Sequence, residues 1–189
     1  NVVDPLDIVN EYGADALRTY VLFMGDYGAA APWNDSSVRG CKRFLERVAG
    51  LTDIMTEEPA AKDMEVKIHK AIKKVSSDIE AMKFNTAIAC LMTLINEIYA
   101  VGKISKDDLV IFIKLLCPFA PHLCEEIWET IGGEGLLSLS QWPEYEESKT
   151  VEDSIEIGVQ VNGKVRGTIV IPNGCAKEVR CCCTRWTRS

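Results

Sequence analysis

The sequence has little of what an active site usually needs. It contains only two histidines, no Cys-x-x-Cys pair, no glycine-rich phosphate loop, and no serine beside a plausible base. It also lacks an initiator methionine, a basic leader and any run of about 18 apolar residues. We therefore expect no catalytic residue, no metal, no cofactor and no membrane span in this chain, which begins as if cut from a longer protein.

The composition is that of a globular protein, with 47% hydrophobic and 26% charged residues. A net charge of −7 argues against a general nucleic-acid binder, so any contact with a polyanion must be local. Several cysteines stand singly among apolar residues, which is typical of reduced core residues in a cytoplasmic protein. These are Cys41, Cys90, Cys117 and Cys124.

Helical periodicity dominates the first 150 residues. Asp4 and Pro5 predict a short helix that ends at Gly13, and a second helix follows from Asp15 to about Phe23. Further helices are predicted from Asp35 or Ser36 to about Met55, around Ile68–Met82, from a cap at Asn85 to Gly102, from Ser105, and around Leu123–Ile131. The short connections predict four or five antiparallel helices packed as a bundle.

From Ser154 the period of the apolar residues changes to two. Ile155, Ile157, Val159 and Val161 alternate with polar residues or glycine, and Asn162-Gly163 is a strong hairpin signal. The return strand is expected to place Val165 and Ile169 on one face, with Lys164 and Arg166 on the other. A small second domain with a β-hairpin is therefore predicted after a linker over 138–150.

Two clusters of polar side chains are candidates for a metal or acid–base site. Cys117, His122 and Cys124 could in principle hold zinc, but their spacing fits no common structural site. Glu125, Glu126 and Glu129 could be acid–base residues, but a solvated helix face is the favoured explanation. Neither cluster predicts an active site.

A basic stripe is the remaining functional signal. Arg39, Lys42, Arg43 and Arg47 fall on the side of the 35–55 helix opposite its apolar residues. Cations on one rigid face can contact the phosphates of a polyanion, whereas the alternative is a solvated face that only covers the core. Lys164 and Arg166 beside the predicted turn form a second basic feature, with protection of a strand edge as the alternative.

Several longer stretches resemble one enzyme family. The segment NVVDPLDIVNEYGADALRTYVLFMG resembles the one that follows the KMSKS signature in class Ia aminoacyl-tRNA synthetases, and PFAPHLCEEIWE resembles the signature of their helical anticodon-binding domain. The segments APWNDSSVRGCKRFLERV and VQVNGKVRGTIVIP are similar to the bacterial leucyl-tRNA synthetase family. The resemblance covers residues 1 to about 179.

The resemblance implies a part of an enzyme that docks tRNA. It implies ATP and Mg²⁺ for the parent enzyme, whose KMSKS loop, leucine pocket and editing domain would lie upstream of this sequence. It implies a monomeric cytoplasmic protein that binds leucine-specific tRNA through backbone and shape rather than by stacking on aromatic side chains. Arg39, Lys42, Arg43, Arg47, Asn162, Lys164 and Arg166 are the expected tRNA-binding residues.

The expected organisation is mainly α, with an antiparallel bundle of the class Ia anticodon-binding type followed by a truncated α/β domain. Residues 1–58 would form a stem-contact region, 59–151 the bundle, and 152–189 the small domain. Its last ten residues, RCCCTRWTRS, depart from the family and suggest a shifted reading frame or a gene fragment. A stand-alone RNA- or protein-binding module, or a piece of another class Ia synthetase, remains the alternative.

Overall fold

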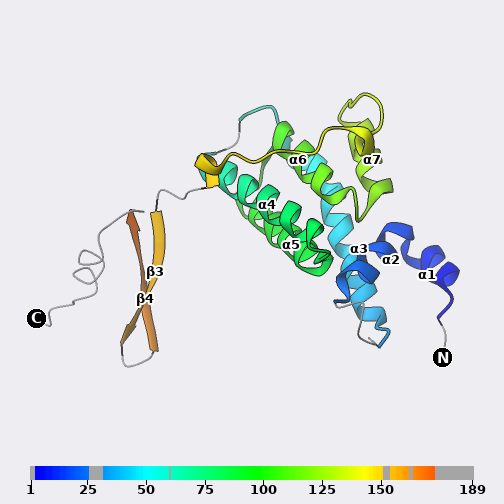
Figure 1. Ribbon diagram of the computed structural model, residues 1–189, viewed down its shortest axis with the longest axis horizontal. Helices are drawn as coiled ribbons and strands as arrows, with labels where there is room; N and C mark the ends of the chain where they lie inside the picture. The colour runs from blue at the N-terminus through cyan, green and yellow to red at the C-terminus, as the bar shows by residue number, and fades with distance from the viewer. Residues whose placement is uncertain (1–2, 26–31, 60, 151–153, 162–163, 173–189) are drawn as a thin grey trace, which may run out of the picture.

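The computed structural model describes residues 3–25, 32–59, 61–150, 154–161 and 164–172, with side chains as far as residue 150. This part of the chain is mainly helical, as predicted (Figure 1). The α-helices are α1 (Pro5–Tyr12), α2 (Ala14–Phe23), α3 (Asp35–Ala49), α4 (Lys62–Glu80), α5 (Phe84–Val101), α6 (Lys106–Leu116) and α7 (Pro121–Thr130). Short 3-10 helices are η1 (Gly50–Ile54), η2 (Leu137–Leu139) and η3 (Glu147–Thr150).

Most helices begin where the sequence indicates. The Asp4 carboxylate accepts a hydrogen bond from the Leu6 amide, and Ser105 Oγ accepts one from the Asp108 amide, so both residues cap as predicted. Two predicted caps were wrong. Asn34 rather than Asp35 or Ser36 caps α3, and α5 begins one residue before Asn85 without a side-chain cap.

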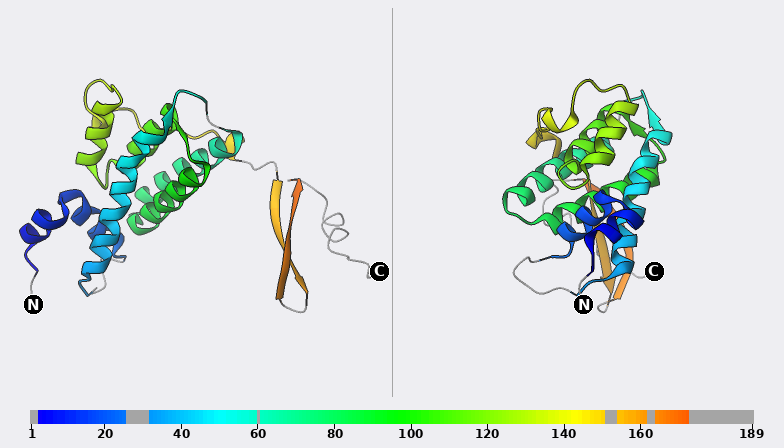
Figure 2. Two further views of the ribbon diagram at one scale, coloured as in Figure 1. Left: turned by 180° about the vertical axis from the view of Figure 1, so that it is seen from behind. Right: turned by 90° about the vertical axis from the view of Figure 1, so that its right-hand side faces the viewer.

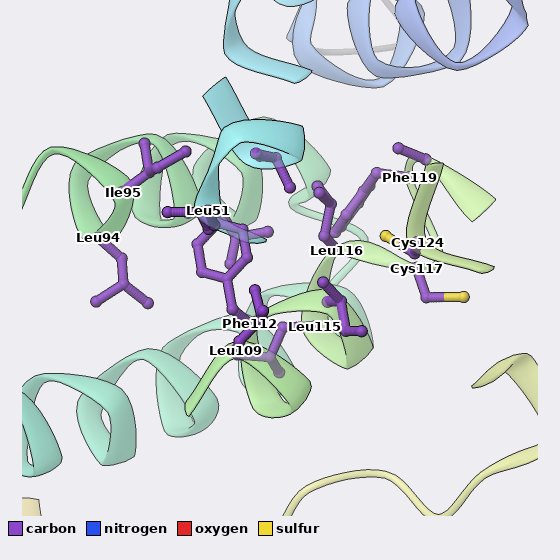
Figure 3. Packing of buried hydrophobic residues seen from close by; sticks show 14 of the residues in the cluster. Leu51, Leu94, Ile95, Leu109, Phe112, Leu115, Leu116, Cys117, Phe119 and Cys124 are labelled. Atoms are coloured by element: carbon purple, nitrogen blue, oxygen red, sulfur yellow. The ribbon is translucent and has the colours of Figure 1, made fainter. Parts of the chain in front are cut away.

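The core lies between α3, α4, α5 and α6. Val38, Cys41, Leu45 and Val48 are buried on one side of α3, which confirms the predicted apolar face of that helix. Figure 3 shows how Leu51 from η1, Ile95 from α5 and Phe112 from α6 pack together, with Cys117 and Cys124 at one end of the cluster. The cysteines of the described residues carry free thiols.

Helix α5 is the centre of this core. Within the described residues, it alone is long and apolar enough to cross a membrane by length and composition. Its residues Ala87, Ile88, Leu91, Leu94, Ile95 and Ile98 are buried, and the helix lies beside α4 along its length (Figure 1). Its polar side chains bond to neighbouring helices, Asn96 to Arg47 and Glu97 to Lys67. These contacts explain its apolar character as that of a core helix.

The segment after α7 is not a free linker. Trp142 Nε1 donates to Ser76 Oγ at 2.8 Å, and the Glu146 amide donates to His69 Nδ1 at 3.1 Å. Lys149 then pairs with Glu65 at 3.1 Å. Residues 137–150 therefore form a strap along α4, so the predicted linker over 138–150 is bonded to the core.

The described residues also contain four strands, two short and two longer. β1 (Met55–Thr56) pairs in parallel with β2 (Ile104–Ser105), a contact that the sequence did not indicate. β3 (Ser154–Val161) pairs antiparallel with β4 (Lys164–Pro172), while residues 162–163 of the predicted turn lie outside the described residues. The Cys181–Cys183 run and the rest of 173–189 also lie outside them.

The register of β3 and β4 contains a bulge that corrects one prediction. Val159 is opposite Gly167 and Gln160 is opposite Val165, which leaves Arg166 as the additional residue on β4. Lys164 is consequently opposite Val161, an apolar position of β3. Strict alternation over 164–168 was therefore wrong, because a bulge resets which positions share a face.

Candidate nucleic-acid interface

Helix α3 positions the predicted basic stripe beside α1. Figure 2 shows α1 and α2 lying against the part of α3 where that helix begins. A groove of about 420 Å³ opens at this junction, lined by Tyr12, Ser36, Arg39, Lys42, Arg43 and Glu46. Three of the four predicted stripe residues thus line one groove, while Arg47 does not.

The four cations of the stripe differ in their contacts. Arg47 Nη1 donates to Asn96 Oδ1 at 2.7 Å, and its guanidinium lies 4.9 Å from the Tyr99 ring centroid. Tyr99 in turn donates its hydroxyl proton to the Arg47 carbonyl at 2.8 Å. Arg47 therefore joins the end of α3 to α5, a contact within the protein that the sequence did not reveal.

Arg39 and Arg43 are placed differently. Both side chains are exposed, and neither has a hydrogen-bond or ion-pair partner within the part of the chain that the structure describes. They are four residues apart on α3, so their side chains project from the same face of the helix. This pair is the free cationic element of the groove.

Tyr12 is a groove residue that the sequence analysis missed. Its ring centroid lies 5.8 Å from Lys42 Nζ, and Lys42 also donates to the Glu11 carbonyl at 3.4 Å. A hydrogen bond to the Glu11 side chain raises the pKa of Tyr12, with a smaller contribution from its partial burial. Tyr12 and Tyr99 thus each contact one cation of the stripe.

The segment considered for zinc or acid–base chemistry makes structural contacts. His122 Nδ1 lies 2.7 Å from Asp15 Oδ1, and the Leu123 amide donates to Asp15 Oδ2 at 2.8 Å. Glu125 accepts hydrogen bonds from the Leu137 and Ser138 amides. Burial raises the pKa of Glu125, but these bonds lower it more, so the net shift is downward. The carboxylate therefore serves to anchor the start of the strap.

No metal site is built by the described residues, which contain no cluster of three or more His, Cys, Asp or Glu side chains suited to an ion. Burial raises the pKa of Cys124 well above its ordinary value, and that of Cys41 to about 11. Thiols in such surroundings stay protonated at neutral pH. The cysteines of the core are packing residues.

A second cleft, of about 360 Å³, lies between α6, α7 and the strap. Arg18 and Lys114 stand at this cleft with Trp142, Pro118 and Leu137. Both cations are engaged, because Arg18 donates to the Pro118 carbonyl at 3.1 Å and Lys114 to the Gln141 carbonyl at 3.1 Å. The cleft is thus held together by its own cations, in contrast to the groove at α3.

The geometry defines a helical domain that carries a basic groove at one end. The sequence pattern of a known family, described as the anticodon-binding domain of tRNA ligase, matches residues 61–180. This match covers more than half of the chain, and the chain belongs to that family.

Three curated relatives that the chain resembles are leucine–tRNA ligases. The chain is 46% identical over 172 residues to the leucine–tRNA ligase of Alkaliphilus oremlandii and 46% identical over 177 residues to that of Bdellovibrio bacteriovorus. It is 40% identical over 185 residues to that of Chlorobaculum tepidum. These matches cover 90–94% of this chain but only 21–23% of the relatives, so the chain spans about a fifth of their length.

The chain is also similar to a solved structure of a leucyl-type synthetase. A crystal structure of a LeuRS from Agrobacterium radiobacter K84, in a ternary complex with tRNA and LeuAMS, superimposes with a TM-score of 0.79 at 33% identity. The match covers 97% of this chain and 26% of the other. The resemblance to leucyl-type synthetases that the sequence motifs indicated is confirmed.

Proposed function

We propose that this chain is the tRNA-docking part of a leucine–tRNA ligase, which joins leucine to its tRNA with ATP and Mg²⁺ in the whole enzyme. The observation that carries the proposal is identity of 46% over 90% of the chain to leucine–tRNA ligases. The groove at α3 supports it, because it offers two unpaired guanidinium groups on a chain that is otherwise acidic. Leucine-specific tRNA is the partner, and the protein acts as a cytoplasmic monomer.

The proposed organisation follows the same reasoning. Residues 1–58 contact the tRNA stem, 59–151 form the antiparallel anticodon-binding bundle, and 152–189 form a small, truncated tRNA-binding domain with a hairpin. Helices α4 and α5 lie side by side and are joined by the short stretch 81–83, which supports an antiparallel bundle. Asn162, Lys164 and Arg166 provide the second contact, where Lys164 begins β4 and Arg166 is the extra residue of its bulge.

The direct test is binding of tRNA to the 189-residue chain, measured by fluorescence anisotropy over a range of salt concentrations. We expect binding to leucine tRNA that weakens steeply with salt, because contacts to phosphates release counterions. Absence of binding to any tRNA at low salt would overturn the proposal. Bovine serum albumin, which is also acidic, serves as the protein control.

A second test concerns the hairpin contact. Lys164→Ala combined with Arg166→Ala should lower affinity for intact tRNA but not for a minihelix that lacks the elbow. Equal losses on both RNAs would place the contact elsewhere on the tRNA, and no loss on either would favour protection of a strand edge.

The unmodified 189-residue chain should show no leucine-dependent exchange of pyrophosphate with ATP, since it contains no ATP-binding motif.

A further inference from the structure

The cations of the basic stripe fall into two groups, those bonded to other residues of the protein and those without a bonded partner in the groove at α3. Arg47 is bonded to Asn96 and stacked on Tyr99, outside the groove. Lys42 lies in the groove but is already bonded to the Glu11 carbonyl. Only Arg39 and Arg43 combine a place in the groove with exposed guanidinium groups that have no bonded partner among the described residues.

The wall facing these two arginines is fixed before any ligand arrives. Tyr12 stands at the end of α1, where its ring packs against buried residues of both hydrophobic clusters. Lys42 lies over that ring at 5.8 Å. A site whose wall is already ordered has less conformational entropy to lose on binding.

The charge along the groove limits what it can hold. Arg39 and Arg43 are one helical turn apart and can approach a single anion together, as guanidinium forks do with phosphate oxygens. Glu46 lines the same groove, three residues after Arg43. A second phosphate group extending toward Glu46 would meet a carboxylate of like charge, so the favourable region is confined to the Arg39–Arg43 end.

We infer that this groove binds one phosphate group of an RNA backbone, with Arg39 and Arg43 as its ligands. Lys42 and Tyr12 form its fixed wall, and Arg47 contributes to the fold rather than to the RNA. The inference rests on the proposed function, because a tRNA is the source of the phosphate. It goes further by reducing a four-residue stripe to one defined site.

The test compares three versions of the 189-residue chain on leucine tRNA. Arg39→Gln with Arg43→Gln should lower affinity and reduce the slope of log K against log salt by about 0.7 to 0.9, the value for one phosphate. Arg47→Gln removes one positive charge from the same helix but should leave that slope unchanged. Arg39→Lys with Arg43→Lys keeps both charges and should retain the slope, which separates loss of charge from loss of folding.

A chemical counterpart identifies the phosphate. A set of leucine tRNAs is prepared, each with a neutral methylphosphonate in place of one phosphate. At one position of the replacement, the wild-type chain and the Arg39→Gln, Arg43→Gln variant should bind with equal affinity. If the wild type binds no tRNA, the proposed function fails. If it binds but the double glutamine variant keeps the full slope, loses twice the expected slope or behaves like Arg47→Gln, this inference fails while the proposed function stands.

Discussion

Asp15 on α2 holds His122 at the start of α7 with 2.7 Å between Oδ1 and Nδ1, although the two residues are 107 positions apart in the chain. The second carboxylate oxygen of Asp15 accepts the Leu123 amide, so one buried side chain supplies the cap that α7 lacks in its own sequence. The Asp15 side chain is 10% exposed and that of His122 75% exposed. The N-terminal helices are thereby fastened to the rest of the core.

Replacing Asp15 with Asn should weaken this joint. The Asn side chain replaces one carboxylate oxygen with an NH2 group and carries no charge, so His122 Nδ1 and the Leu123 amide no longer share a negatively charged partner. We expect a loss of about 1–3 kcal/mol in the free energy of unfolding, measured by urea denaturation. Asp7→Asn, at an exposed position on α1, is the control. Equal stability of the two variants would show that the joint contributes nothing.

Asp78 gives the protein a pH-dependent stability. Burial raises the pKa of this carboxyl, but hydrogen bonds from Lys74 and Thr86 and the charges of Lys74 and Lys83 lower it more, so the folded-state pKa lies below its usual value. A lowered pKa stabilises the fold above the unfolded-state pKa, and this stabilisation is lost as the pH falls through the folded-state pKa.

The variant Asp78→Asn should therefore be less stable than the wild type at pH 7, by about 1–3 kcal/mol for a buried bond to a charged group. The difference should shrink as the pH is lowered below 4, where the wild-type carboxyl also becomes protonated. Thermal melting at a series of pH values measures this. Glu80→Gln, exposed on the same helix, should show no such convergence.

Two glycines should respond in opposite directions to alanine. A Cβ atom at Gly133 would lie 2.1 Å from Trp128 Cδ2, whereas a Cβ atom at Gly40 would meet no atom within 4 Å. Gly133→Ala should destabilise the protein by about 1–3 kcal/mol through overpacking. Gly40→Ala, in the middle of α3, should stabilise it by about 1 kcal/mol. A melting temperature that moves in the same direction for both would contradict this packing.

The strap should open without unfolding the core. Trp142→Phe removes the hydrogen bond to Ser76 Oγ, one of the contacts that hold residues 137–150 on α4. We expect faster hydrogen exchange at the Glu146 amide, which bonds to His69, with little change in the main melting transition. Glu144→Gln, exposed in the same segment, should leave that exchange rate as it is.

Much of the helical fold could be predicted because its signals are local. Asp4, Gly13 and Ser105 act within one turn of their own helix ends, and the apolar face of α3 follows from a period of 3.6. The basic stripe came from the same helical wheel. Its division into free and engaged cations did not, because Arg47 is bonded to Asn96, a residue 49 positions away.

What the sequence did not reveal has two physical causes. One is contact between segments distant in the chain, and the other is a β-bulge that shifts the strand register. Asp15 reads as a first-turn acid of α2, and nothing nearby in sequence indicates that it caps α7. The segment over 138–150 has the composition of a linker, yet its bonds to α4 order it. Lys164, Val165 and Arg166 alternate perfectly in sequence, so the bulge at Arg166 is visible only in the register.

The strap also limits the distance between the helical core and the β3–β4 strand pair. Between the end of α7 at Thr130 and the start of β3 at Ser154, the chain would be a long flexible tether if it were free. Because η3 is fastened to α4 through Lys149, only the bonds from Thr150 to Ser154 separate the two parts, a reach of about 14 Å at full extension. For an RNA bound in the groove at α3, as proposed, the strand pair would be a second contact tethered within this short reach, so its local concentration at the RNA would be set by the strap.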